Sequence, residues 1–298
     1  MTSCVDYRHL PVGTRRRIRL RFVRHAPFEI EPVSVEPPCR VRRPVMLQGW
    51  NDLAAVHWRY QVDEVQPLLP DGFAVDTFDG SAWVGLIPFQ MNRIRIPKLP
   101  PLGRWSSFPE TNVRTYIVDP QGRRGVWFFS LDINRLVPTF VARLTYRLPY
   151  CWSSMTIRSS SWRGVSHPGL AGSDGCETGS VSVEGSTWTY ESRRRWPKGV
   201  AISSLAIQVG ERIRPEDLTG LDHFLSARWA LGTTLAGRLM WANVAHAPWV
   251  FHTAEVVKCD ETLLLAAGLR SPSGKPIARW SRGVEVTIER PRIVRRCA

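Results

Sequence analysis

Short apolar runs separated by turn-forming residues recur along this chain of 298 residues, and they restrict it to a strand-rich fold. The clearest example is the pair of runs 73–78 and 81–87, which Asp79 and Gly80 separate. Asp-Gly is typical of the two-residue turn between antiparallel strands, because both of its positions need left-handed backbone angles. The 13 tryptophans agree with this, since aromatic residues favour strands. We therefore predict mainly antiparallel β structure.

The same reasoning places further elements. A second hairpin is predicted at 110–117 and 125–132, because the intervening Asp119-Pro-Gln-Gly122 has proline and glycine where a tight turn prefers them. A helix is predicted near 215–232, which begins with proline, glutamate and aspartate and continues with apolar residues at helical spacing. The remaining elements that we predict are a short helix at 62–69, a hairpin formed by 254–257 and 263–269, and a late strand at 283–289.

Polar side chains alternate along the strand predicted at 110–117. Side chains point to opposite faces of a strand in turn, so Glu110, Asn112, Arg114 and Tyr116 share one face. Such a face is typical of an antiparallel strand that is solvated on one side. It would equally suit a pocket inside a closed sheet, with a carboxyl, an amide, a guanidinium and a phenol turned inward. Both interpretations stay open at this point.

A second polar stretch, 141–150, ends at a proline corner. Pro149 fixes its own backbone angle and favours an extended Leu148, so Tyr150 is expected on a stiff corner. The fork of Arg143, if it points inward, would bind a carboxylate through two parallel hydrogen bonds. The chain has many arginines, however, and most arginines lie on the surface. Arg143 is thus a candidate anion ligand with an ordinary surface position as its alternative.

The chain resembles the uncharacterised YqjF-like family of bacterial proteins, a branch of the acetoacetate decarboxylase-like superfamily. The blocks that carry the resemblance are His57-Trp58, Leu69-Pro-Asp-Gly-Phe73, Asp76-Thr-Phe-Asp-Gly80, Glu110 to Tyr116, Phe128-Phe-Ser-Leu-Asp132, Leu148-Pro-Tyr150 and His246-Ala-Pro-Trp249. Together they extend from about Leu47 to Ile288. The resemblance implies an α+β, β-rich fold, namely an antiparallel barrel or cone-like sheet with a few short helices.

The resemblance to the decarboxylase itself assigns roles residue by residue and then fails at one position. Glu110 is similar to the family's active-site glutamate, and Pro149 to the proline before the catalytic lysine pair. Arg143 is similar to the arginine of the family's Gly-Arg-Glu run, although Ala142 and Leu144 replace its neighbours. Tyr150 and Cys151 replace that lysine pair. A Schiff base needs an amine nucleophile with a depressed pKa, which a phenol or thiol cannot replace. We therefore predict no Schiff-base chemistry and take Glu110, Arg143 and Tyr150 as candidate catalytic residues.

Lysine occurs only four times in the chain, which limits what could replace the missing amine. Lys98, Lys198 and Lys275 lie beside proline or glycine in predicted loops, and Lys258 precedes a turn-like run. Tyr150 could instead donate a hydrogen bond or act as an acid or base. Its alternatives are a packed aromatic residue or a plug that closes the pocket.

Further candidate ligand-binding residues join Arg114, Tyr116 and Asn112. His57, His246 and Asp132 are candidates, although each histidine precedes or closely precedes tryptophan in an apolar segment, which favours a structural role. The sequence has no His-Glu-x-x-His or paired Cys-x-x-Cys spacing, so we predict no metal site. Because it also lacks a glycine-rich phosphate loop, we predict no nucleotide cofactor.

The positive charge of the chain is concentrated at its beginning. Residues 1–45 contain ten arginines and four acidic residues, while the formal net charge of the whole chain is +14. This arginine- and proline-rich segment is expected to be a disordered extension. Residues 46–298 are expected to form one acetoacetate decarboxylase-like domain, with Met46 as an alternative start. The six scattered cysteines suggest reduced thiols in the cytoplasm. We predict no membrane span, because the sequence contains no run of about 18 apolar residues.

Two functions of different classes follow. The first is a pocket for a small carbonyl or carboxylate compound, with binding expected to be unaffected by removal of residues 1–45. The second is partner or nucleic-acid binding through the arginine-rich segment and the cluster Arg193 to Trp196, with a steep dependence on salt. We favour the first, because no nucleic-acid motif is present, and a homo-oligomer stays open.

Overall fold

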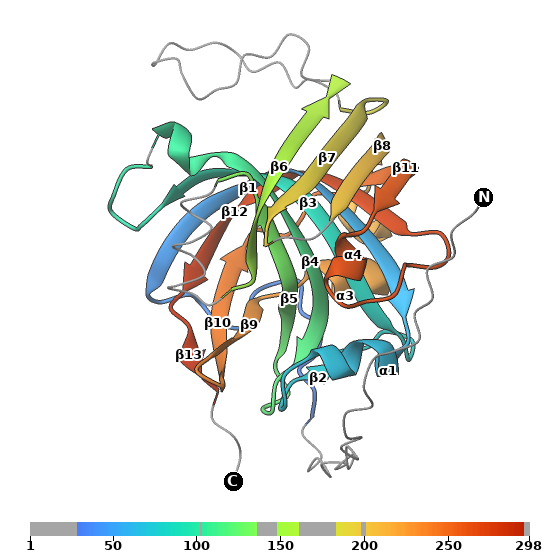
Figure 1. The fold of residues 1–298 in the computed structure, drawn as a ribbon. Coiled ribbons are helices and arrows are strands. Elements are labelled where there is room, and N and C mark those ends of the chain that lie inside the picture. Colours follow the sequence, from blue (N-terminus) through green and yellow to red (C-terminus); the bar gives the residue numbers. More distant parts are fainter. Residues whose placement is uncertain (1–28, 102, 136–147, 161–182, 198–200, 295–298) are drawn as a thin grey trace, which may run out of the picture.

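The computed structural model of the protein describes residues 29–101, 103–135, 148–160, 183–197 and 201–294. These residues form one continuous 13-stranded sheet with a few short helices, as the sequence predicted (Figure 1). The strands are β1 Pro44–Tyr60, β2 Ala74–Val75, β3 Ala82–Arg95, β4 Phe108–Val118, β5 Arg124–Ile133, β6 Tyr150–Ser159, β7 Thr187–Trp196, β8 Ile202–Arg212, β9 Ala230–Leu235, β10 Arg238–His246, β11 His252–Glu261, β12 Ile277–Glu289 and β13 Arg292–Ile293. The helices are α1 Val62–Val65, α3 Gly220–Ser226 and α4 Leu263–Ala266, with 3-10 turns η1 Gln66–Leu68, η2 Gly103–Ser106 and η4 Pro215–Asp217.

Seven of the strands close into a ring. The ring follows the order β10-β9-β5-β4-β3-β1-β12, and the pairing of β12 with β10 closes it. All of its contacts are antiparallel except the short parallel pairing of β5 with β9. The ring therefore encloses an interior into which every second side chain of each strand points.

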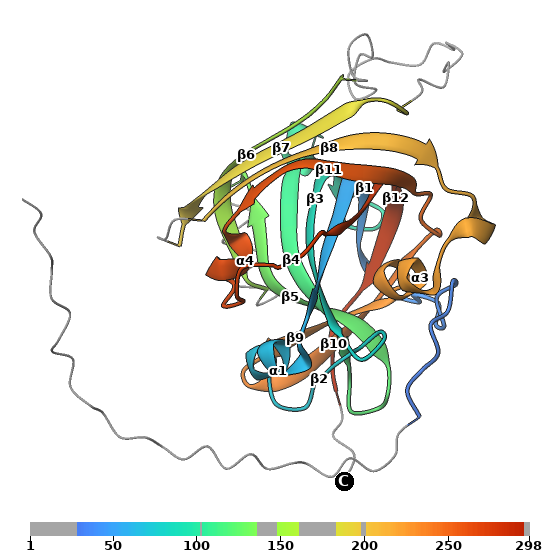
Figure 2. The same cartoon turned by 90° about the vertical axis from the view of Figure 1, so that its right-hand side faces the viewer.

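The other long strands form an arc outside the ring. β6, β7, β8 and β11 continue from β5 to β12 and lie as a layer over β4, β3 and β1 (Figure 2). The largest apolar core lies between the arc and the ring, where Trp188 and Ile207 of the arc belong to the same cluster as Val113 and Leu86 of the ring. β4 is consequently buried on both faces. The polar face of this strand is therefore turned into the ring and not toward solvent.

The predicted hairpins are confirmed in part. β4 and β5 pair antiparallel around the turn at residues 119–122, as expected. The Asp79-Gly80 turn also forms, with hydrogen bonds in both directions between the main chains of Phe78 and Ser81. Beyond this turn, however, β2 pairs with β4 and not with β3. The turn residues specify the local bend, but they do not determine which strand the preceding residues join.

Two other predictions need correction. The run 263–269, expected as the second strand of a hairpin with 254–257, contains helix α4, while β11 pairs with β8. Lys258 accordingly lies within β11 and not before a turn. The helix expected over 215–232 is confined to η4 and α3, because Ala230–Leu235 forms β9. The predicted helix at 62–69 and the late strand at 283–289 are confirmed.

The segment 29–36 contacts the ring. The main chain of Glu31 donates a hydrogen bond to Gly122 O, and the indole nitrogen of Trp229 donates one to Ser34 O at 2.8 Å. These residues precede β1 and lie against the ends of β5 and β9.

Candidate functional site

A cavity of about 130 Å³ occupies the interior of the ring. All seven strands of the ring contribute to its lining, together with the end of α3, the start of β6 and residues of adjoining loops. Most of the wall is apolar, with Trp50, Phe128 and Trp249 as its large aromatic members. The polar residues that line it are Gln48, Glu110, Asn112, Arg114, Tyr150, Ser226, Arg228, Thr233 and His246. A mostly apolar cavity with a few convergent polar groups is the usual form of a small-molecule site.

Three of these polar residues come from β4. Glu110, Asn112 and Arg114 alternate along the strand, so they form a polar column about 13 Å long from end to end. Glu110 and Asn112 are each 4% exposed. Tyr116 continues the same face but packs below the cavity in an apolar cluster. Of the two interpretations that the sequence left open for this face, the structure has the one in which Glu110, Asn112 and Arg114 point into the ring.

Four buried polar atoms in this cavity wall have no hydrogen-bond partner among the described residues. They are Glu110 Oε2, Asn112 Oδ1, Arg114 Nε and Arg228 Nη2. Buried polar groups in proteins are nearly always paired, and an unpaired one costs about 1–3 kcal/mol. Four such atoms therefore face one cavity without a protein partner in the described ranges.

Glu110 is the titratable group of the column. Burial, and secondly the negative charge of Asp132, raise the pKa of Glu110 to about 8. The carboxyl group is therefore mostly protonated at neutral pH and can donate a hydrogen bond. The guanidinium groups of Arg114 and Arg228 also donate hydrogen bonds, so the charged and titratable groups of the cavity wall are mainly hydrogen-bond donors.

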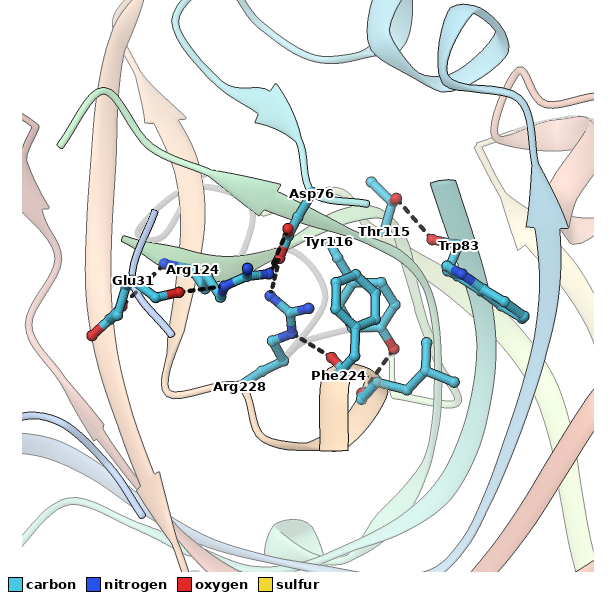
Figure 3. Close-up of polar contacts among 9 residues, drawn as sticks. Glu31, Asp76, Trp83, Thr115, Tyr116, Arg124, Phe224 and Arg228 are labelled. Carbon is cyan, nitrogen blue, oxygen red and sulfur yellow. Dashed lines mark hydrogen bonds and ion pairs between the residues drawn. The ribbon is translucent and has the colours of Figure 1, made fainter. Parts of the chain in front are cut away.

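Arg228 enters the cavity from the turn between α3 and β9. Its Nη1 donates to Asp76 at 2.6 Å and its Nε donates to Phe224 O at 2.7 Å (Figure 3). The guanidinium also stacks on the rings of Tyr116 and Phe224, with centroid distances of 4.6 and 4.3 Å. Burial lowers the pKa of Arg228, although the neighbouring Asp76 opposes this. The guanidinium is thus held by the Asp76 carboxylate, by the Phe224 carbonyl group and by the two aromatic rings.

Asp76 is shared between two arginines. Its carboxylate, 3% exposed, also accepts from Arg124 Nη1 at 2.6 Å. Arg124 in turn donates from Nε to Glu31 O at 2.5 Å. Sequence reasoning did not assign Arg228, Arg124 or Asp76 to the site. The pairing of Arg228 with Asp76 joins residues 152 positions apart, so no local pattern indicates it.

His57 and Tyr116 form a hydrogen-bonded pair beneath the cavity. The hydroxyl group of Tyr116 donates to Leu225 O at 2.9 Å, and His57 Nε2 lies 2.7 Å from the hydroxyl oxygen. Because that hydroxyl group has one hydrogen, His57 Nε2 must be the protonated ring nitrogen and the donor. Burial, and then the charges of Arg114 and Arg279, hold the pKa of His57 well below its usual value. The neutral His57 therefore supports Tyr116, and it does not line the cavity.

The remaining predicted site residues are distributed differently. Tyr150 and His246 line the cavity, and His246 also packs between the rings of Trp229 and Trp249. Burial lowers the pKa of His246. Asp132 lies on the opposite face of β5, where Ser153 donates to it at 2.7 Å and Arg194 binds both of its oxygens. Arg143 lies outside the described residues, so its role as an anion ligand stays a prediction.

Several other features bear on the alternatives raised by the sequence. In the cluster Arg193 to Trp196, Arg194 is turned inward to Asp132, so only part of this cluster faces solvent. Within the described ranges, no group of three or more His, Cys, Asp or Glu side chains is placed to hold a metal ion. No described helix has both the length and the apolar character that a membrane crossing requires.

Solved structures share this fold. The enduracididine biosynthesis enzyme MppR complexed with pyruvate superposes with a TM-score of 0.54, over 86% of this chain and 92% of that one, at 14% identity. An acetoacetate decarboxylase-like enzyme from Sphingomonas wittichii RW1 gives a TM-score of 0.53, over 87% of this chain and 96% of that one, at 13% identity. The fold is thus that of the acetoacetate decarboxylase-like proteins.

The sequence comparison then places the chain within this fold. The chain belongs to the DUF2071 family of uncharacterized conserved proteins, and the match covers residues 47–285. The uncharacterized protein YqjF of Bacillus subtilis (strain 168) is 27% identical over 242 residues, which cover 81% of this chain and 89% of YqjF. The resemblance drawn from the sequence blocks is confirmed.

Proposed function

We propose that the ring interior binds a small compound with a carboxylate and a second oxygen, such as an oxo acid. The observation that carries this proposal is the set of four buried polar atoms that line one cavity without partners among the described residues. Arg114 Nε and Arg228 Nη2 would donate to the carboxylate, since charge-assisted hydrogen bonds of this kind are strong. The protonated carboxyl group of Glu110 would donate to a carbonyl oxygen.

The size of the cavity supports a small ligand. Its volume of about 130 Å³ is similar to that of an engineered protein cavity of about 150 Å³ that holds benzene. A compound of about six non-hydrogen atoms therefore matches the space. The enzyme MppR, which shares the fold, has been solved in complex with pyruvate, and pyruvate is a ligand of this size and chemistry.

The cavity does not favour the amine chemistry of a decarboxylase. None of the residues that line it in the described part of the chain is lysine. Lys98, Lys258 and Lys275 are exposed. Tyr150, which the resemblance matches to the family's lysine pair, lines the cavity. We propose that binding proceeds without a Schiff base, and that any proton transfer is made by Glu110, whose pKa of about 8 suits an acid–base group.

Calorimetric titration of the full chain with pyruvate, pyruvamide and acetoacetate tests this proposal. We expect the two acids to bind and Arg114→Gln to weaken their binding about tenfold or more, because it removes a charged donor. Arg238→Gln is the matched control, since Arg238 is an exposed arginine on β10, another strand of the same ring. An unaltered chain that binds neither acid, or an Arg114→Gln variant that binds them as well as the control does, would contradict the proposal.

A further inference from the structure

Arg228 depends on a second layer of residues for its position. Of its three nitrogens, Nη1 is bound by Asp76 and Nε by Phe224 O, so the remaining Nη2 is the one without a partner in the described part of the chain. A guanidinium is planar, and two fixed nitrogens determine where the third one points. Asp76 therefore neutralises the charge of Arg228 and helps to fix the direction in which its guanidinium points.

Asp76 is itself held by Arg124, and Arg124 is held by the segment before β1. The main-chain nitrogen of Arg124 donates to the Glu31 side chain at 3.2 Å, and its Nε donates to the Glu31 main-chain oxygen at 2.5 Å (Figure 3). The same segment binds the neighbour of Arg228, because Trp229 donates to Ser34 O at 2.8 Å. The segment 31–34 therefore contacts Arg124, which binds Asp76, and Trp229, which follows Arg228 in the chain.

We infer that Asp76 and the segment 31–34 form a brace that positions Arg228 and thereby gives the cavity its preference for a carboxylate. This inference rests on the proposed function. The segment precedes residue 47, where the family match begins, so the brace extends the site beyond the matched region. It also differs from the expectation that residues 1–45 are dispensable for ligand binding.

The brace acts on charge recognition more than on the shape of the cavity. Neither Asp76 nor the segment 31–34 lines the cavity. Losing either one leaves the apolar wall unchanged but frees the guanidinium to turn away from the ligand. A charged ligand should lose affinity, whereas an uncharged ligand of the same shape should lose little. A general loss of stability would instead weaken both ligands equally.

The first test compares pyruvate with pyruvamide, its uncharged analogue, on the full chain. We expect Asp76→Asn to reduce the ratio of the two affinities about tenfold, which corresponds to about 1.4 kcal/mol. Asparagine keeps the size of the side chain and removes its charge, and urea unfolding of the same samples shows how much of the variant is folded.

A second variant displaces the segment without touching either arginine. Gly122 has φ +80°, and a Cβ there would lie 2.5 Å from Glu29 O, two residues before Glu31. Because the main chain of Glu31 also donates to Gly122 O, Gly122→Ala should push the segment away. Gly80→Ala is the matched control, because Gly80 has φ +72° and nothing lies within 4 Å of an added Cβ. Both variants carry the same backbone strain, and only Gly122→Ala should lower the preference for pyruvate.

The outcomes separate the two proposals. Reduced selectivity in Asp76→Asn and Gly122→Ala, with Gly80→Ala unchanged, supports the brace. Retained selectivity in folded Asp76→Asn or Gly122→Ala overturns the brace while the proposed function stands. An unaltered chain that does not bind pyruvate overturns the proposed function and the brace with it.

Discussion

Glu110 is the single residue whose protonation state changes the character of the cavity. Its pKa is raised from 4.5 to about 8, so the folded chain keeps a proton that the unfolded chain releases. The free energy of unfolding should therefore decrease as the pH rises from about 4.5 to about 8, and be unaffected by this group outside that window. Below pH 8 the cavity holds a neutral donor at this position, and above it a carboxylate.

The proposed ligand should respond to the same titration. We expect the dissociation constant of pyruvate to rise with pH above about 8, by about tenfold per pH unit, because the anion then meets a second negative charge. Glu110→Gln keeps a neutral side chain and should remove this pH dependence. Titrations at pH 6, 7, 8 and 9 on both chains measure the effect. A Glu110→Gln profile as steep as that of the unaltered chain would assign the dependence to another group.

Sequence reasoning could find Glu110, Asn112 and Arg114 because the alternation of a strand fixes which side chains share a face. It could not choose between solvent and interior for that face, since the choice depends on the arc that covers the other side of β4. Arg228, which lies within the helix predicted near 215–232, could not be assigned to the site for a related reason. Its spacing from Phe224 and Leu225 suits a helix, but the helix ends at Ser226 and the side chain turns toward Asp76.

At the scale of elements, the short helix α3 positions side chains at the cavity and beneath it. Its carbonyl groups at Phe224 and Leu225 accept from Arg228 and Tyr116. The helix begins with a capping box, in which Thr219 accepts from the Asp222 main chain and Asp222 accepts from the Thr219 main chain. A helix of this length has little intrinsic stability, so its cap and packing must hold it.

Removal of the cap should therefore be measurable. Thr219→Ala is expected to lower the free energy of unfolding by about 1 kcal/mol, as cap removal usually does. Thr187→Ala is a control, because Thr187 is exposed at the beginning of β7 and caps no helix. Urea unfolding of both variants gives the comparison, and a Thr219→Ala loss no larger than that of Thr187→Ala would show that packing alone sustains α3.

Short apolar runs were the least predictable elements. The run 263–269 suits a strand or a buried helix equally well, because a run of this length lacks a decisive period. The structure resolves it as α4, whose Leu263 and Leu264 are fully buried in the main core. The contacts that decide this come from distant strands, which local sequence cannot reveal.

At the scale of the whole molecule, the ring is closed by strands far apart in the sequence. β1 pairs with β12, so that Leu47 lies beside Thr287, and β12 reaches back to β10. The resemblance to a known fold predicted a closed sheet, whereas composition and periodicity predicted only antiparallel strands. The arc adds a second connection, because its two end strands, β6 and β11, pair with β5 and β12 of the ring.

A buried ion pair joins the ring to the arc. Asp132 of β5 is fully buried and binds Arg194 of β7 through two hydrogen bonds of 2.8 and 2.7 Å, while Ser153 of β6 donates to the same carboxylate. This geometry pairs both charges where the side chains of Arg194 and Asp132 are 7% and 0% exposed. Loss of one partner would leave the other charge buried and unpaired.

Asp132→Asn should for this reason destabilise the molecule by about 3–5 kcal/mol, the range found when one member of a buried pair is removed. The matched control is Glu285→Gln, which breaks an ion pair with Arg93 whose side chains are 55% and 63% exposed, and an exposed pair of this kind contributes at most about 1 kcal/mol. Urea unfolding measures both changes. Comparable small losses would mean that the apolar core between the layers holds the arc without the ion pair. A large loss confined to Asp132→Asn would place Asp132 in the framework that keeps β4, and with it the polar column of the cavity, in place.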